Sequence, residues 1–427
     1  MMTISTRALA VALVLGGFAA AAPAFGQMYS PPATQKIPEK EANAPAAEPT
    51  GPVRKYSNSA RKALVELQAA VNAKDVANIP AKLAAAQAAA KNADDRYTIA
   101  QFQIKAAIDQ KDTAGISAGI QAMDASGGAA PGETVPHHVA VGKQFYDAKQ
   151  YDAAAIDLER ALALDPNYAD AIILLAETRK SQGRVPEAVA LLQKGIAARV
   201  AAGQKPTEDW YKRAVGLAYN AKLPAAVQLS RDWVAAYPSP TNWRDALRIY
   251  KNGSGLDNDT LIDLMRLQRA AGALAGETDY YNYAAAVLLK GYPGEAKAVL
   301  DEGFAAKSID RNKPVFRQVL AQASAKTPGD RASLPSLEKA ALASGAAKQS
   351  MVTGDAYLGY GDYAKAAAMY RGALTKTGVD PNLANLRLGI ALARSGDKAG
   401  ATTAFNAVTG VRADIAKYWL LWLSTRA

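Results

Sequence analysis

Residues 142–167 read GKQFYDAKQYDAAAIDLERALALDPN. Gly142, Ala154 and Ala161 are small and stand at fixed offsets from bulky neighbours such as Leu158, and the stretch ends in Asn after Asp-Pro. Alanine favours helix, and two helices approach closely where side chains are small and bulky residues of the facing helix fill the remaining space. The stretch therefore predicts two antiparallel helices joined by a short turn.

The alanine at position 154 recurs along the chain. Similar stretches place alanine at positions 188, 226, 296, 366 and 401, with intervals of 34, 38, 70, 70 and 35 residues. A fixed period in this range is typical of a helical repeat array. Because each interval of 70 equals two units of 35, we expect one degenerate unit in each, with two helices in residues 241–272 and two in residues 312–343.

The spacing resembles the tetratricopeptide repeat (TPR), a family whose 34-residue unit is a helix–turn–helix. The best unit, residues 135–168, combines the small residues already named with Pro166 at the end of its second helix, and further units begin near residues 169, 207, 277, 347 and 382. The resemblance covers roughly residues 135–415. It implies an all-α, right-handed superhelical solenoid of antiparallel helix pairs, with a concave face lined mainly by the first helix of each pair.

The sequence divides into five segments. We expect a signal peptide (1–26), a disordered Pro/Ala-rich linker (27–57), N-terminal TPR-like helix pairs (58–126), a TPR solenoid (135–411) and a C-terminal capping helix (412–427). Helices in the N-terminal pairs are expected at 59–73, 76–91, 95–109 and 113–126. The last helix carries Ile415, Tyr418, Trp419 and Trp422 at helical spacing, which predicts that it covers the last repeat; a partner- or membrane-binding helix is the alternative.

The first residues have the pattern of an exported protein. Arg7 precedes the apolar run ALAVALVLGGFAAAA, and small residues suited to cleavage follow near Ala24 or Gly26. The run is short for a membrane span, so we expect a periplasmic protein with no stable membrane insertion after cleavage, and secretion is the alternative. The chain has no cysteine, which excludes disulfides, and its net charge of +11 is scattered, which argues against nucleic acid as a partner.

One motif is similar to a catalytic sequence. Residues 115–119 (GISAG) match G-x-S-x-G, in which Ser117 would be the nucleophile. Such a nucleophile needs a preceding strand and a distant histidine, but the sequence predicts helices here and the only histidines are His137 and His138. Adjacent residues on a helix point about 100° apart, so these two do not readily share a metal ion. We therefore predict no enzyme, no metal site and no cofactor, with a hydrolase acting through Ser117 as a minor alternative.

A partner is expected on exposed positions of the first helices. Tyrosine and arginine are favoured contact residues, although several of the tyrosines could instead pack between repeats. The Lys/Asn/Lys/Arg set with which the family holds a peptide C-terminus is not reproduced, because Val139 and Leu174 occupy positions that should be polar. The positions that the TPR pattern brings to the groove are Lys143, Tyr211, Lys212, Tyr219, Tyr281, Asn282, Asp355 and Arg387.

These features predict a non-catalytic periplasmic scaffold that binds a protein or peptide partner of the cell envelope in its concave groove. The alternative is a glycan-binding factor in peptidoglycan or exopolysaccharide assembly, because the stretches DYYNYA (279–284) and YLGYGDYA (357–364) are rich in tyrosine. The repeat register nevertheless predicts core packing for Tyr280, Tyr283 and Tyr357.

Overall fold

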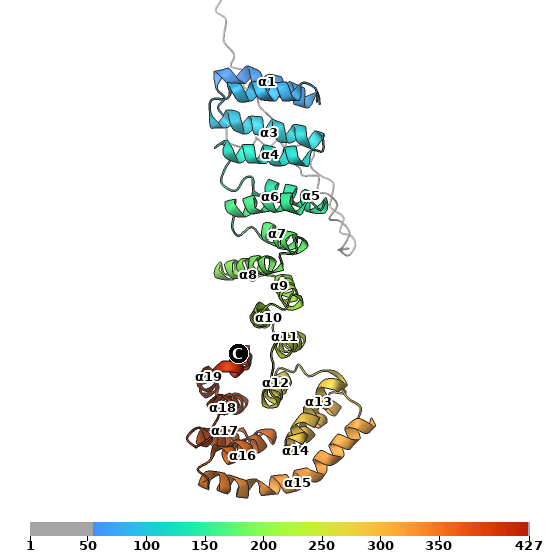
Figure 1. Cartoon of the computed structure of the whole chain (residues 1–427), viewed down its shortest axis with the longest axis vertical. Coiled ribbons are helices and arrows are strands. Elements are labelled where there is room, and N and C mark those ends of the chain that lie inside the picture. The colour runs from blue at the N-terminus through green and yellow to red at the C-terminus, as the bar shows by residue number, and fades with distance from the viewer. Residues whose placement is uncertain (1–53, 426–427) are drawn as a thin grey trace, which may run out of the picture. The chain divides into compact units, whose positions relative to one another are not determined.

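A computed structural model describes residues 54–425, so the predicted signal peptide and nearly all of the predicted linker lie outside the described residues. Within this range the chain is helical, without strands apart from an isolated bridge between Ala346 and Thr377. No helix in the same range is long and apolar enough to cross a membrane. Figure 1 shows the helices, which in chain order are α1 (Asn58–Asn72), α2 (Ile79–Ala89), α3 (Ala93–Asp109), α4 (Thr113–Ala125), α5 (Val135–Asp147), α6 (Tyr151–Leu164), α7 (Ala169–Ser181), α8 (Val185–Ala201), α9 (Glu208–Asn220), α10 (Ala225–Ala236), α11 (Pro240–Gly253), α12 (Asn258–Ala270), α13 (Gly276–Leu289), α14 (Pro293–Ala305), α15 (Pro314–Ala343), α16 (Ala347–Gly359), α17 (Tyr363–Leu374), α18 (Pro381–Ser395), α19 (Lys398–Asn406), the 3-10 turn η1 (Gly410–Arg412) and α20 (Ala413–Ser424).

The described residues form two compact units. Those up to Gln110, together with Gln121–Ala129, make the first, and Lys111–Ile120 with the residues from Ala130 onward make the second. The first unit packs α1, α2 and α3 around Leu67, Val71 and Phe102. The four helices predicted between residues 59 and 126 are all present as α1–α4.

The alanines that set the repeat period are buried at the start of second helices. All six are no more than 5% exposed, and they lie in α6, α8, α10, α14, α17 and α19. Gly389 shows how close the paired helices come, because an added Cβ on this residue of α18 would lie 2.5 Å from the ring of Phe405 on α19. The small residues recur because they allow the facing helix to pack closely.

Replacing Gly389 with alanine should lower the free energy of unfolding by about 1–3 kcal/mol, because overpacking a core forces side chains out of place. The matched control is Gly372→Ala in α17, where an added Cβ meets no atom within 4 Å. That substitution should stabilise the protein by about 0.5–1 kcal/mol. Urea denaturation of both variants measures the difference, and equal effects would contradict the steric role of Gly389.

The prediction of two helices in residues 241–272 is confirmed by α11 and α12, whereas the same prediction for residues 312–343 is wrong. The second stretch is one helix, α15, of 30 residues. Pro328 and Pro335 lie inside it, although proline normally kinks or ends a helix by removing a backbone donor. At 1.5 Å per residue α15 is about 45 Å long, so it bridges two groups of helices instead of folding into a pair.

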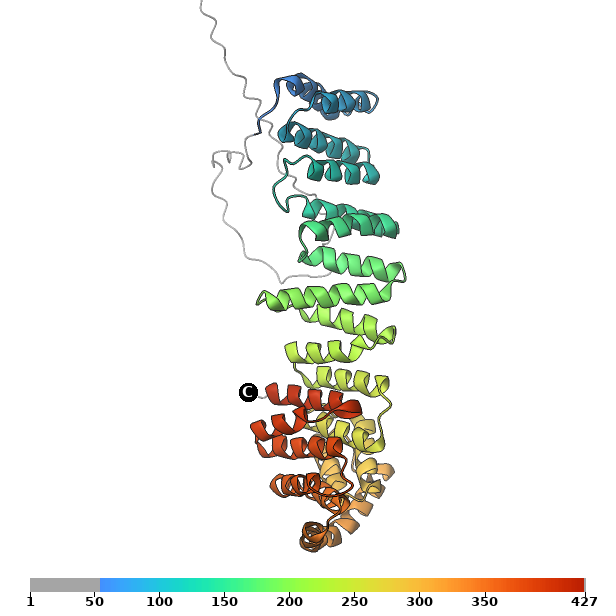
Figure 2. The ribbon, with the colours of Figure 1, turned by 60° about the vertical axis from the view of Figure 1, so that its left-hand side comes forward.

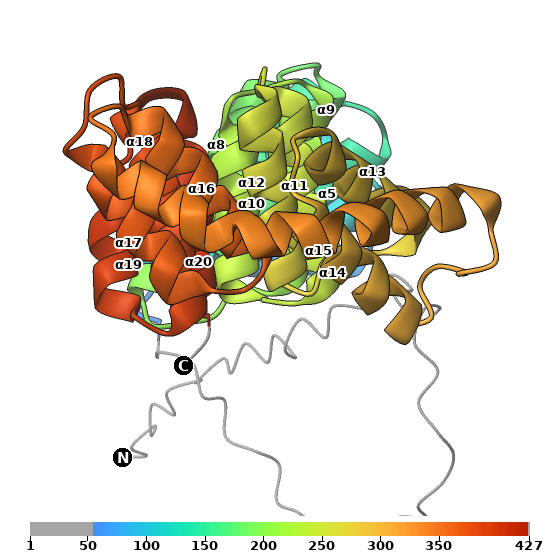
Figure 3. The ribbon, with the colours of Figure 1, turned by 90° about the horizontal axis from the view of Figure 1, so that it is seen from below.

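The two halves of α15 belong to different cores. Phe316 and Ala323 pack in a core with α13 and α14. Leu334 and Ala341 pack in a core that α16–α20 share with α11 and α12. Beyond α15 the chain therefore runs back beside its earlier helices, as Figures 2 and 3 show within the second unit.

Two glycines allow close contact between the helices before and after α15. An added Cβ on Gly294 of α14 would lie 2.3 Å from the ring of Tyr360, and one on Gly359 of α16 would lie 3.0 Å from Cβ of Glu295. The backbones of α14 and α16 can approach this closely only because both positions lack a side chain. We call the region from α10 to α20, closed in this way, the fold-back lobe.

Helix α20 covers the last repeat, as the sequence predicts for residues 412–427. The ring of Trp419 stacks on Phe405 of α19 with their centroids 6.0 Å apart. The helix also packs on earlier elements, which the sequence did not predict, because the ring of Tyr418 lies 5.6 Å from that of Tyr250 and 6.3 Å from that of Trp243. It therefore closes the fold-back lobe on one side.

Candidate partner-binding surface

The structure separates the eight predicted contact residues into two groups. Tyr211, Asp355 and Arg387 are buried, with 3%, 2% and 3% of their surface exposed. The expectation that these three side chains face an open groove is therefore corrected. The other five are exposed or half-buried, and partner binding by them stays a prediction: Lys143, Lys212, Tyr219, Tyr281 and Asn282.

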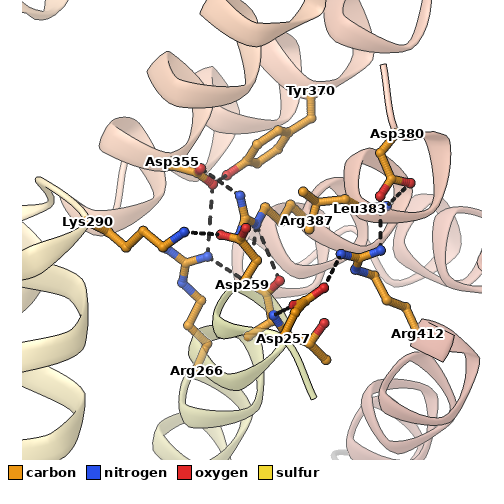
Figure 4. A network of polar contacts seen from close by, with 12 residues as sticks. Asp257, Asp259, Arg266, Lys290, Asp355, Tyr370, Asp380, Leu383, Arg387 and Arg412 are labelled. Atoms are coloured by element: carbon orange, nitrogen blue, oxygen red, sulfur yellow. Dashed lines mark hydrogen bonds and ion pairs between the residues drawn. The ribbon is translucent and has the colours of Figure 1, made fainter. Parts of the chain in front are cut away.

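Asp355 and Arg387 belong to a buried network that joins α12, α13 and α14 to α16, α17 and α18, which we call the junction cluster. Figure 4 shows part of it, with Asp259, Arg266, Asp355, Tyr370 and Arg387 labelled. Its members are Asp259, Asp263, Arg266, Tyr283, Tyr292, Glu295, Asp355, Tyr370 and Arg387. The network forms where it does because α15 returns α16 and α18 to the side of α12.

Arg387 of α18 contacts carboxylates from both sides of the junction. Its Nη1 donates to Oδ2 of Asp355 at 2.7 Å, and its Nη2 donates to Oδ1 of Asp259 at 3.0 Å. Its Nε lies 3.3 Å from Oδ2 of Asp263. Asp259 and Asp263 belong to α12, more than a hundred positions earlier, so this guanidinium ties α18 to α12.

Arg266 of α12 forms a bidentate ion pair with Glu295 of α14. Its Nε and Nη2 donate to Oε1 and Oε2 at 2.9 and 2.7 Å, and its Nη1 donates to Asp263 at 2.8 Å. Tyr283 donates its hydroxyl proton to Glu295, while Tyr292 and Tyr370 donate theirs to Asp355. Planar guanidinium and carboxylate groups match in this geometry, which gives the contact direction as well as strength.

The carboxylates of the junction cluster are not equivalent. Burial raises the pKa of Asp263, although Arg387 and Arg266 act in the opposite direction. Burial also acts to raise the pKa of Glu295, but the charge of Arg266 and the hydrogen bonds from Arg266 and Tyr283 outweigh it and lower the pKa. The cluster thus contains three buried carboxylates (Asp263, Glu295 and Asp355) and two guanidinium groups. These groups form hydrogen bonds with one another and with the tyrosines of the cluster, as expected of a structural junction.

Four of the five exposed or half-buried candidates lie on the first helices α9 and α13, whereas Lys143 lies on α5. Polar contacts link these helices side by side: Arg213 of α9 pairs with Glu177 of α7 at 3.0 Å, and Asn252 of α11 donates to the hydroxyl of Tyr219 at 2.9 Å. Arg244 of α11 donates to the carbonyl of Ala275 before α13. We call the exposed side chains of α9, α11 and α13 the first-helix surface; it comprises Lys212, Tyr219, Arg248, Asn252, Tyr281 and Asn282.

On α9 the first-helix surface has open space next to a glycine. Gly216 lies between Lys212 and Tyr219 on α9, and a Cβ added there would meet no atom within 4 Å. Residues at 212, 216 and 219 share one face of a helix. The space is bordered by an ammonium group and a phenol that is 37% exposed, so it offers both charge and a ring to a ligand.

Ser117 of the G-x-S-x-G match lies inside helix α4, not on a strand-to-helix turn. Its hydroxyl donates to Oδ2 of Asp157 at 2.8 Å, and Nδ1 of His138 lies 2.9 Å from Oδ1 of the same carboxylate. All three side chains are buried. The carboxylate stands between serine and histidine, whereas a catalytic triad needs the histidine next to the serine.

The variant Ser117→Ala should therefore lower the free energy of unfolding by about 1.5–3 kcal/mol, the net value of a hydrogen bond to a carboxylate, without any effect on partner binding. Thermal and urea denaturation measure the first quantity. A hydrolytic activity of the wild-type chain that disappears in this variant would contradict the structural role.

Among the described residues no group of three or more His, Asp or Glu side chains is placed to hold a metal ion.

The comparison with family models finds a match to the tetratricopeptide repeat over residues 145–202. This match confirms, for residues 145–202, the repeat that the spacing predicts. In sequence, no curated protein matches the chain.

Several solved structures are similar to this chain at low sequence identity. A tetratricopeptide repeat protein from Parabacteroides merdae is 11% identical over 70% of this chain and 99% of its own, with a TM-score of 0.28. The TPR2AB-domain:pHSP90 complex of yeast Sti1 is 14% identical over 69% and 99%, with a TM-score of 0.24. PilF of Pseudomonas aeruginosa is 14% identical over 64% and 90%, with a TM-score of 0.20. We draw no conclusion about function from structures with such low identities and TM-scores.

Proposed function

We propose that this chain, which matches the tetratricopeptide repeat over residues 145–202, is a non-catalytic scaffold that holds a protein or peptide partner on its first-helix surface. The tetratricopeptide repeat fold is in general a scaffold for protein–protein interaction. The observation that carries the proposal is the open space over Gly216, with the exposed side chains of Lys212 and Tyr219 on either side.

The proposed setting is the cell envelope. The pattern of residues 1–26 supports export, and the lack of cysteine suits a protein whose stability rests on packing alone. We propose that the mature protein works in the periplasm and that its partner is an envelope protein which presents an extended segment or a helix.

Three of the tyrosines that suggested the glycan alternative are buried. Tyr280, Tyr283 and Tyr357 are at most 4% exposed, as the repeat register predicts, and two of them donate hydrogen bonds to buried or half-buried carboxylates. Of the tyrosines in DYYNYA, Tyr281 presents a ring to solvent, and it is 37% exposed. A protein partner is therefore the better proposal.

The test uses a substitution that fills the open space without harming the fold. Gly216→Leu should keep or raise the stability, because glycine inside a helix is unfavourable by about 1 kcal/mol relative to ordinary helix formers. A photo-crosslinking residue at Tyr219, introduced into cells that express the full chain, should yield a protein adduct of defined mass that Gly216→Leu removes.

The matched control is Gly372→Leu, at a helical glycine in α17 that also has open space around it. This control should leave the adduct unchanged. An adduct that persists in Gly216→Leu would contradict the site, and retention of the purified chain on isolated peptidoglycan, with no protein adduct, would favour the glycan alternative.

A further inference from the structure

An open cavity of about 690 Å³ lies where the start of α13 meets the end of α14 and the loop that leads into α15. We call it the α14–α15 cavity. Its size is that of a small-molecule site, because such sites have volumes of about 300–1,000 Å³. Phe304 and Ile309 supply its apolar lining. The ring of Phe304 makes an edge-on contact with the buried ring of Phe316, with their centroids 6.4 Å apart, so the cavity offers a ligand a ring that is held in place.

The three carboxylates that line the α14–α15 cavity already have donors within the chain. A cationic ligand would have to displace these donors, so the acidic groups do not mark a site for a cation. The contacts are Nζ of Lys313 to Oε1 of Glu277 at 2.6 Å, Nζ of Lys297 to Oδ2 of Asp301 at 2.6 Å, and the backbone N–H of Asn312 to Oδ1 of Asp310 at 2.9 Å.

The two cations that line the cavity, Lys307 and Arg311, are held much less firmly. The ammonium of Lys307 is exposed and forms no ion pair with any other described residue. Arg311 pairs with Asp301 at a long distance of 3.7 Å, and that carboxylate is already bound to Lys297. The guanidinium of Arg311 lies over the ring of Phe304, with Cζ 4.7 Å from the ring centroid. Two cations and a ring thus face one cavity with capacity left for an anion.

We propose that the α14–α15 cavity binds a carboxylate that is attached to an apolar or aromatic group. The carboxylate accepts charge-assisted hydrogen bonds from Lys307 and Arg311, and the apolar group packs against Phe304 and Ile309. Two sources supply this chemistry: a small organic acid, and an acidic side chain next to an apolar one in a peptide. The cavity uses other residues than the first-helix surface, so this inference does not rest on the proposed function.

The test removes a cation from the cavity without harming the fold. Lys307 follows α14 with a φ of 54°, in the left-handed region that favours glycine. Lys307→Gly should therefore keep or raise the stability while it deletes the ammonium. Lys222, which follows α9, has the same φ of 54° and does not line the cavity. Lys222→Gly is consequently a control with the same change in charge and in backbone freedom.

The first probe is 4-fluorophenylacetate, which joins a carboxylate to a ring, and its binding to the full chain is followed by the change in its fluorine NMR signal. Lys307→Gly and Arg311→Met should each weaken the binding by about fivefold or more, because each removes a charged donor. Lys222→Gly should leave it unchanged. The uncharged 4-fluorophenylacetamide should bind at least about fivefold more weakly than the acid, and added salt should weaken the acid selectively.

Competition with short peptides then distinguishes the two sources. Displacement of the fluorinated acid by acetyl-Phe-Glu-amide but not by acetyl-Phe-Gln-amide would assign the cavity to an acidic side chain of a peptide, and displacement by neither would assign it to a small organic acid. Equal binding of the fluorinated acid and its amide, equal losses in Lys307→Gly and Lys222→Gly, or no binding of the fluorinated acid to the wild-type chain would each overturn the proposal.

Discussion

Replacing Arg387 with methionine is expected to lower the free energy of unfolding by about 3–5 kcal/mol, because removing one partner of a buried ion pair leaves the remaining charges uncompensated. Asp263 and Asp355 would lose one of the two cations that they share, and only Arg266 would remain, in a site with almost no access to water. Methionine keeps much of the volume of arginine, so the loss measures charge more than packing. Urea denaturation followed by tryptophan fluorescence reports it, since Trp243, Trp419 and Trp422 share the core of the fold-back lobe.

The matched control is Arg248→Met. This arginine on α11 is 66% exposed and pairs only with Asp245 one turn earlier, so its replacement should change the stability by no more than about 0.5 kcal/mol. Comparable losses in the two variants would show that Arg387 is not held in a buried network.

A second large effect is expected at the opposite end of the second unit. Asp157→Ala should lower the free energy of unfolding by about 3 kcal/mol or more, because the carboxylate is the shared partner of Ser117 and of His138 and all three are buried. The loss should exceed that of Ser117→Ala, which removes only one of the two contacts. Thermal denaturation monitored by circular dichroism measures both.

The control lies on the same helix. Asp152 is exposed in the first turn of α6 and accepts a hydrogen bond from Gln182, so Asp152→Ala should lower the stability by no more than about 1 kcal/mol. A small effect of Asp157→Ala, similar to that of Asp152→Ala, would mean that the Ser117–Asp157–His138 contacts contribute little to the fold.

The local structure follows from the sequence because it depends on neighbours within one helix pair. The alanines at a period near 35 mark positions where facing helices touch, and the structure places all six in second helices and buries them. The same logic located α11 and α12. It failed for residues 312–343, where the interval of 70 residues predicts a helix pair, because packing against two different cores maintains the single helix α15.

The junction cluster could not be derived from the repeat pattern. In that pattern Asp355 and Arg387 occupy positions open to solvent, and their burial depends on helices that return from beyond α15. One signal was present: the run LRLGIALA (386–393) in α18 has no polar face apart from Arg387. A helix that is apolar all round is buried on all sides, so this run indicates a second packing layer and marks its single charge as a buried one.

The fold-back of the chain at α15 is the central claim of this account, and a double-mutant cycle between Asp263 of α12 and Arg387 of α18 tests it most directly. The two side chains are 124 positions apart in sequence and 3.3 Å apart in space, so Asp263→Asn and Arg387→Met should show a coupling energy of about 1–3 kcal/mol. Stabilities of the two single variants that add in the double variant to within about 0.5 kcal/mol would contradict the fold-back, because residues that do not meet are independent.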